Sequence, residues 1–315
     1  MRHTLSAFTS KTPLLNAICT LDAETAQRQA QQADRDLAQG KRVGPLHGVP
    51  ITIKDLFKTK GLKTTAGFPE LSGYVPEDDA PTVAKLKQAG AIILGKTNIS
   101  KAGSEYQSKN PVFGRTQNPW NLGRTPGGSS GGSATAVAAG FSSLDLCSDF
   151  GGSIRQPAHF CGLYGLKPTD RRVATVGHIP PLPDLPESIR YMLTVGLLAR
   201  SLPDLKLGLQ VIAGPLSQQP DIPAVPLTEP QETVSLHGLR LAWCKGIAPL
   251  WPQQSICNAI TQAVESLEID GAQMIPWQAP GWDWERLLSV YYRLSTLSLR
   301  YVQRPTINAL TDLAQ

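Results

Sequence analysis

The chain has 315 residues, of which 41% are hydrophobic and 17% charged, a balance that argues against a disordered protein and favours a globular one with a large core. Its net charge of +5 comes without a concentrated run of lysine and arginine, so nucleic acid is not expected as a direct partner. The sequence contains no apolar stretch of about 18 residues, so no membrane span is predicted. The amino-terminal residues lack the apolar run of a signal peptide. Five cysteines without a CxxC pair predict free thiols in a reducing, cytoplasmic compartment.

Helix and strand patterns alternate along the first hundred residues. The alanine-rich segment 23–39 places apolar side chains on one face and is followed by a glycine, which predicts an amphipathic helix. Residues 48–54 alternate apolar and polar side chains, which predicts a strand, whereas the glycines and prolines of residues 61–80 predict a loop. A helix at 82–88 and a buried strand at 91–94 are expected next. This order predicts a mixed or parallel α/β sheet.

The segment 127–157 has the most distinctive pattern in the chain. Small residues at 133–139 predict a buried helix, and residues 144–147 predict a short strand. Pairs of glycines precede Ser129 and Ser153, one on each side of these two elements. We therefore expect both serines at the same edge of a sheet, in turns whose glycines let backbone amides approach a ligand and face a developing negative charge.

A lysine, Lys54, ends the strand predicted at 48–54. It is expected on the face opposite to Ile51 and Ile53. Taken alone, a lysine at the end of an apolar strand is more often a solvated strand end than a functional group. The role of Lys54 therefore depends on which side chains the fold places next to it.

The carboxyl-terminal half predicts further helices and strands. In chain order we expect a proline-rich loop at 178–186, an apolar stretch at 192–198, a helix at 201–212, a linker at 214–230, a strand at 239–243, a helix at 255–267, a strand at 273–277 and a helix at 284–301. The proline-rich run is interpreted as an irregular surface loop, with a functional lid as the alternative.

Six ordered motifs carry a resemblance to a known family. They stand at 48–55, 95–98, 118–120, 127–134, 148–158 and 160–169. In this order, and with the two serines 24 residues apart, they resemble the amidase signature family of serine amidohydrolases. The resemblance covers residues 15–215 and fades beyond them. It implies an α/β fold with a mixed, mostly parallel central sheet covered by helices on both faces, in a single domain over 1–315 that stops before the family's usual carboxyl-terminal part.

The resemblance also implies a catalytic set. It assigns Ser153 as the nucleophile, Ser129 on a cis peptide as the relay and Lys54 as the base. These residue types suit the chemistry, because a serine hydroxyl needs a neighbouring base and burial lowers the pKa of a lysine so that it can be neutral. A hydroxyl can accept one hydrogen bond while donating another, as a relay must.

An oxyanion hole is implied at the backbone amides of Phe150, Gly151, Gly152 and Ser153. Gly128 and Ser130 complete the expected oxyanion and substrate-binding set. Many relatives have threonine at the position of Phe150, but a backbone group performs the task, so we expect the change to narrow the acyl side of the pocket and not to abolish activity. For Ser130, a hydrogen bond to the lysine and a structural turn role both stay open.

The functional hypothesis is an amidohydrolase that cleaves a carboxamide C–N bond through an acyl-enzyme on Ser153. It takes a small-molecule carboxamide as substrate and needs no metal or cofactor, and a homodimer or a companion subunit stays open. One alternative is the glutamine-hydrolysing A subunit of a tRNA-dependent amidotransferase, and another is an inactive short member of the family. A site formed by Ser153 and His159 is a weaker interpretation, as is a phosphate loop at 127–132, which no lysine follows. We also expect Asp149 and Arg155 to form an ion pair that holds the nucleophile loop.

Overall fold

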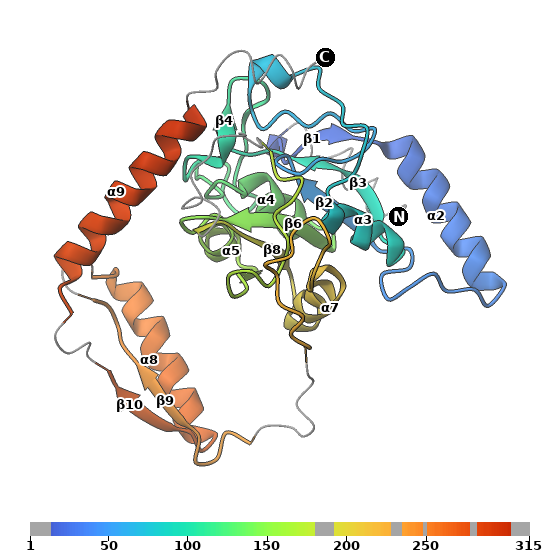
Figure 1. Cartoon of the computed structure of the whole chain (residues 1–315). Helices are drawn as coiled ribbons and strands as arrows, with labels where there is room; N and C mark the ends of the chain where they lie inside the picture. The colour runs from blue at the N-terminus through green and yellow to red at the C-terminus, as the bar shows by residue number, and fades with distance from the viewer. Residues whose placement is uncertain (1–13, 180–191, 228–234, 248–250, 278–281, 304–315) are drawn as a thin grey trace. The chain divides into compact units, whose positions relative to one another are not determined.

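The computed structural model describes residues 14–179, 192–227, 235–247, 251–277 and 282–303 (Figure 1). The chain separates into two compact units, Met1–Pro226 with Ser298–Gln315, and Leu227–Leu297, and each is described by itself. The single domain expected from the resemblance stays a prediction. The proline-rich loop expected at 178–186 lies outside the described residues, apart from its first two.

A mixed six-stranded sheet forms the centre of the first unit (Figure 1). Its order is β1 (Ile18–Leu21), β3 (Ile92–Thr97), β2 (Pro50–Lys54), β6 (Leu144–Asp149), β8 (Thr194–Ala199) and β7 (Tyr164–Leu166). The neighbours β3, β2 and β6 are parallel, and β1 and β8 run antiparallel to them. Since β7 is antiparallel to β8, it shares the direction of β6, which confirms the predicted mixed, mostly parallel sheet.

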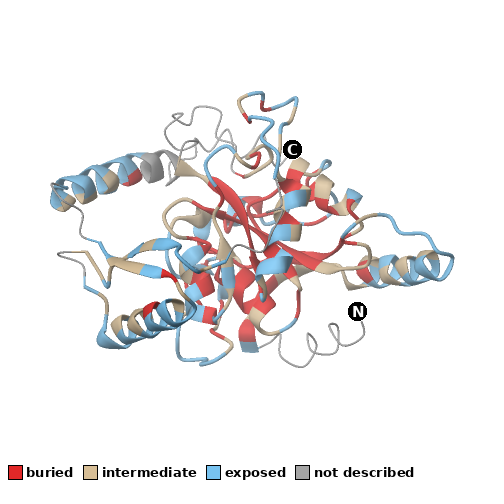
Figure 2. Ribbon diagram, turned by 90° about the horizontal axis from the view of Figure 1, so that it is seen from below, coloured by how far each residue is buried: buried red, intermediate tan, exposed pale blue. Residues whose placement is uncertain are grey.

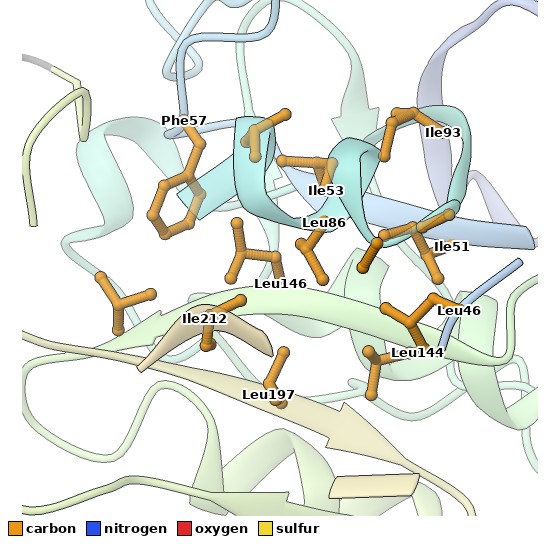
Figure 3. Close-up of a cluster of buried hydrophobic side chains, with 14 of the residues drawn as sticks. Leu46, Ile51, Ile53, Phe57, Leu86, Ile93, Leu144, Leu146, Leu197 and Ile212 are labelled. Carbon is orange, nitrogen blue, oxygen red and sulfur yellow. The ribbon is translucent and has the colours of Figure 1, made fainter. Parts of the chain in front are cut away.

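One face of the sheet is covered by α3 (Pro81–Gln88) and α7 (Leu202–Ile212). Because side chains alternate along a strand, Leu144 and Leu146 of β6 point to this face. There they pack in one apolar cluster with Leu86 of α3 and Ile212 of α7, and the side chains converge between helix and sheet (Figure 3). Each fully buried leucine or isoleucine contributes about 1.5–3 kcal/mol, so this cluster anchors the strands that carry the site.

The opposite face is covered by α4 (Gly131–Ala138) and α5 (Arg155–Cys161). Cys147, which follows Leu146 on β6, packs there with Ala134 and Ala158. The approach of α4 is close, because a Cβ on Gly132 would collide with the backbone of Asn98. The predicted helices on both faces of the sheet are therefore confirmed. The helix α2 (Ala23–Ala38) packs on β3 through Ala26 and leaves its outer side exposed (Figure 2).

Small elements complete the first unit. They are the 3₁₀ turns η1 (Pro69–Leu71) and η2 (Lys101–Gly103) and the hairpin of β4 (Lys109–Asn110) and β5 (Gly114–Arg115). The helix α5 and the strand β7 were not among the predicted elements. The helix has 7 residues, contains Pro157 and ends at Gly162 in a left-handed conformation with φ 67°, so it is too short to show a helical period in the sequence.

The second unit contains a parallel strand pair and two long helices. They are β9 (Arg240–Trp243), α8 (Gln254–Ile269), β10 (Gln273–Pro276) and α9 (Trp284–Gln303), which agree with the predicted strand, helix, strand and helix. Of α9, only the residues up to Leu297 belong to this unit. Across the described parts of both units, none of the helices combines the length and the apolar character that crossing a bilayer requires.

Candidate active site

Lys54 is the last residue of β2, and its side chain is buried at 1% exposure. The ammonium nitrogen donates to the hydroxyl of Ser129 at 2.8 Å and to the backbone carbonyl of Ser148 at 3.1 Å. Both acceptors are uncharged. The lysine is therefore an interior group in contact with a hydroxyl, and the solvated strand end considered from the sequence is wrong.

Burial lowers the pKa of Lys54 from its ordinary value of 10.5 to about 8. Removing an ammonium from water penalises its charged form. The acidic groups of β6, namely Cys147, Asp149 and Asp145, act in the opposite direction. Because a pKa near 8 leaves roughly a tenth of the lysine neutral at pH 7, a free amine is accessible at ordinary pH.

Ser129 follows a cis peptide bond from Gly128, in the loop that enters α4. The hydroxyl of Ser108 fixes this loop: it donates to the carbonyls of Gly127 at 3.1 Å and Ser129 at 3.2 Å and accepts from the Gly131 amide at 2.7 Å. A Cβ on Gly128 would lie 2.6 Å from the Glu105 carbonyl oxygen, so only glycine fits there. No pattern in the sequence indicates this role of Ser108, which lies in a turn-rich segment.

The loop of Ser153 is organised by the carboxylate of Asp149. Asp149 accepts from the amides of Gly152 at 2.8 Å and Ile154 at 2.9 Å. It also accepts two hydrogen bonds from the Arg155 guanidinium, at 2.7 and 3.0 Å, so the predicted ion pair is confirmed. Burial pushes the pKa of Asp149 up, but the hydrogen bonds from Arg155 and from the two amides outweigh it and lower the pKa below its usual value.

The two serine loops meet above the end of β2. The Ser130 amide donates to the Ser153 carbonyl at 3.3 Å, and Ser129 and Ser153 are both buried. The Ser130 hydroxyl lies 3.5 Å from the Ser148 carbonyl, the acceptor that Lys54 also uses. The structure thus brings Lys54 and Ser129 into direct contact and places Ser153 in the adjoining loop.

Two of the expected oxyanion and substrate-binding groups point into the protein. The Gly152 amide donates to Asp149 at 2.8 Å, and the Gly128 amide donates to the Gln156 side chain at 3.1 Å. An amide hydrogen directed at one acceptor is poorly aimed at another. In this structure both amides therefore hold the loops together, and the expected roles of Gly152 and Gly128 stay predictions. Phe150 and Gly151, both partly exposed, stay expected donors together with the Ser153 amide.

Two polar networks lie beside the site. In the first, Asp145 accepts from the Thr52 hydroxyl at 2.6 Å and from the Cys147 thiol at 3.1 Å, and burial raises the pKa of this carboxyl. In the second, Lys96 and Asp55 form a fully buried ion pair at 3.4 Å. Neither pairing is evident from the sequence, although Asp55 and Lys96 both lie in the motifs at 48–55 and 95–98.

One histidine, His159, was considered for the site from the sequence, and the structure places a different one there. His159, the residue considered beside Ser153, is exposed on α5 with its ring next to Phe160. His178 lies at the site instead, with Nε2 2.9 Å from the Ser148 hydroxyl.

Within the ranges described above, no three His, Cys, Asp or Glu side chains gather closely enough to hold a metal ion. The arrangement is suited to proton transfer between a buried amine and hydroxyl groups.

Comparison with known proteins extends over nearly the whole chain. The model of the Amidase family matches residues 1–312. The chain is 40% identical to the A subunit of a glutamyl-tRNA(Gln) amidotransferase from Roseiflexus sp. (strain RS-1), over 90% of this chain and 56% of that protein.

Solved structures of amidases also match most of this chain. A peptide amidase from Stenotrophomonas maltophilia superposes with a TM-score of 0.75 at 32% identity, covering 88% of this chain and 57% of its own. A bacterial aryl acylamidase has a TM-score of 0.80 at 26% identity, covering 94% and 61%. The chain therefore spans 56–61% of the length of these three relatives.

Proposed function

The chain belongs to the amidase family, and we propose that it hydrolyses a carboxamide C–N bond through an acyl-enzyme on Ser153. One observation carries the proposal: the buried amine of Lys54 lies 2.8 Å from the Ser129 hydroxyl, whose loop is hydrogen-bonded to that of Ser153. A buried amine that contacts a hydroxyl beside a nucleophile candidate is the arrangement expected of a general base.

The proposed reaction begins with the neutral form of Lys54. Its amine takes the proton of the Ser129 hydroxyl while that oxygen takes the proton of Ser153. The Ser153 oxygen attacks the carbonyl carbon, and the electron pair of the C=O bond moves to its oxygen. The amides of Phe150, Gly151 and Ser153 are proposed to stabilise that oxyanion, a contribution worth about 3–4 kcal/mol for one donor.

Two further steps complete the cycle. The leaving nitrogen takes the proton that the lysine now carries, back through Ser129, and departs as ammonia or an amine. Water then attacks the ester carbonyl on Ser153, giving its proton to the same relay, and the carboxylic acid leaves. Each proton removed from a nucleophile is thus returned to a leaving group, and no cofactor is required.

A fluorophosphonate probe tests the proposal. It should label the folded chain at Ser153, located by peptide mass spectrometry, and a Ser153→Ala variant should stay unlabelled. A chain that unfolds in one cooperative thermal transition but takes up no probe would refute the hydrolase and favour the inactive alternative. A panel of primary and secondary carboxamides then identifies the substrate class.

A second candidate is supported by the 40% identity to the A subunit of an amidotransferase. In this function the same acyl-enzyme would form from glutamine, and a companion subunit would carry the released ammonia to an acceptor on tRNA. Co-purification with a tRNA-binding partner favours it, whereas efficient turnover of other carboxamides by the isolated chain disfavours it. For either function we propose a cytoplasmic location, which the five free cysteines support.

A further inference from the structure

We propose that His178 is a positioning residue for this reaction, which it serves by holding Ser148 where the Ser148 carbonyl binds Lys54. The inference rests on the proposed function above. It concerns a side chain that the resemblance assigned no role and that follows Gly177 as the first residue of the proline-rich segment 178–186.

A chain of contacts joins His178 to the serine relay. His178 Nε2 lies 2.9 Å from the Ser148 hydroxyl. The carbonyl of Ser148 accepts from Lys54 at 3.1 Å, and the same lysine nitrogen donates to Ser129 at 2.8 Å. Every link is within hydrogen-bonding distance, so a shift of Ser148 moves an acceptor of the proposed base.

The strand geometry explains why Ser148 can serve both partners. Side chains alternate along β6, so the Ser148 side chain points to the same face as Leu146, toward α3 and α7, whereas Lys54 lies on the other face with Thr52. A strand carbonyl lies in the plane of the sheet, between the two faces. The Ser148 hydroxyl and carbonyl therefore reach His178 and Lys54 from opposite sides of one residue.

The imidazole is itself fixed against the chain that follows β2. Its ring meets the Phe57 ring edge to face, with centroids 5.0 Å apart and planes at 84°. Phe57 and His178 also form a β-bridge, and the Lys58 amide donates to the Gly177 carbonyl at 2.9 Å. Since Phe57 lies three residues after Lys54, these contacts lead from the end of β2 back to the segment that directly follows it.

The charge state of His178 agrees with a positioning role. Burial, and then the nearby charge of Lys54, lower its pKa to about 3, so the ring is neutral at ordinary pH and a poor base. A neutral imidazole can either donate to the Ser148 hydroxyl or accept from it, and both orient that side chain without adding a second cation beside the lysine.

A double-mutant cycle tests the proposal in the full chain, with the rate of probe labelling at Ser153 as the readout. His178→Phe keeps a ring against Phe57 and loses the nitrogen, and Ser148→Ala removes only the hydroxyl. Each should slow labelling by about three- to tenfold, the loss of one hydrogen bond. The double variant should be no slower than either single one, and His178→Gln, which keeps a polar group near Nε2, should recover most of the rate.

If the native chain is labelled, two outcomes overturn the inference. One is an unchanged labelling rate in His178→Phe. The other is a double variant whose labelling rate falls by the product of the two single reductions. Thermal unfolding of each variant separates slow labelling from unfolded protein. If the native chain is not labelled at all, the proposed function fails, and the contact is tested by imidazole nitrogen NMR. The His178 signals should then shift in Ser148→Ala, and unchanged signals overturn the inference.

Discussion

Two buried lysines on neighbouring parallel strands have contrasting partners. Lys96 on β3 pairs with the Asp55 carboxylate at 3.4 Å and also donates to the Phe57 carbonyl at 2.7 Å. Lys54 on β2 meets only uncharged oxygens in its hydrogen bonds, those of Ser129 and Ser148. Burial lowers the pKa of both lysines. The two lysines differ in their hydrogen-bonding partners. The Asp55 carboxylate opposes the lowering of the Lys96 pKa, because it stabilises the ammonium form of that lysine.

The comparison distinguishes a structural lysine from a reactive one. A buried ammonium beside a carboxylate is held in its charged form. If either partner loses its charge, the other is left as a buried charge without a counter-ion. A buried ammonium beside a hydroxyl has no such counter-ion and can release its proton at modest cost. Burial alone therefore does not identify the base; the nature of its partner does.

The largest expected effect separates the two lysines by activity. Lys54→Met should slow probe labelling of Ser153 by about 10²–10⁴-fold, the usual contribution of a general base. Lys96→Met, the matched control, should label at close to the native rate per folded molecule, because its amine contacts neither serine. Equal loss in both variants, normalised for folded protein, would show that the lysines are not functionally distinct.

The second prediction separates them by stability. Lys96→Met leaves the Asp55 carboxylate buried without its cation, which costs about 3–5 kcal/mol in a buried pair. Urea denaturation should show this loss, and adding Asp55→Asn should restore part of it, since the remaining group is then neutral. If the double variant is as unstable as Lys96→Met alone, the ion pair is not the reason for the loss.

The third prediction concerns the space around the partner of Lys54. A Cβ on Gly103 would lie 2.9 Å from Leu56 Cδ1 and 3.3 Å from Ser129 Oγ, at a φ of 68°. Gly103→Ala should therefore slow labelling by about tenfold, the equivalent of roughly 1.4 kcal/mol. It should also lose about 1 kcal/mol of stability through its left-handed conformation.

Gly61 offers a matched control for that conformation. Its φ is 78°, and its Cβ would meet nothing within 4 Å. Gly61→Ala should show a similar loss of stability and an unchanged labelling rate. A slower rate in Gly61→Ala would mean that backbone strain, and not crowding of Ser129, explains the result at Gly103.

Much of the fold followed from patterns within single segments. The strand that ends at Lys54 showed an alternating pattern, and a run of small residues indicated the buried helix after Ser129. The strand before Ser153 was also predicted from its own segment, and parallel strands bring their carboxyl ends to one edge. The helix α5 was not found because it is short and contains Pro157. Local patterning therefore predicted the long helices and the central strands of the sheet, but not its edge strands β1 and β7 or the short helix that follows the nucleophile candidate.

The contacts that tune the site depend on pairings that no single segment encodes. The proximity of Asp55 and Lys96 follows from the register of β2 on β3, which shifts at an irregularity between Ile51 and Thr52. The contact of His178 with Ser148 follows from the path of a loop that returns over Phe57. Both are set by tertiary packing, so the sequence names the residues without indicating their partners.

The pH dependence of Ser153 labelling tests the role of Lys54 most directly. The active form carries the neutral amine, so the rate should rise with pH and reach half of its maximum near the lysine pKa of about 8. Lys54→Met should lose that rise, and Lys96→Met should keep it. A native rate that does not change between about pH 6 and 9, or a rise that persists in Lys54→Met, would contradict Lys54 as the base.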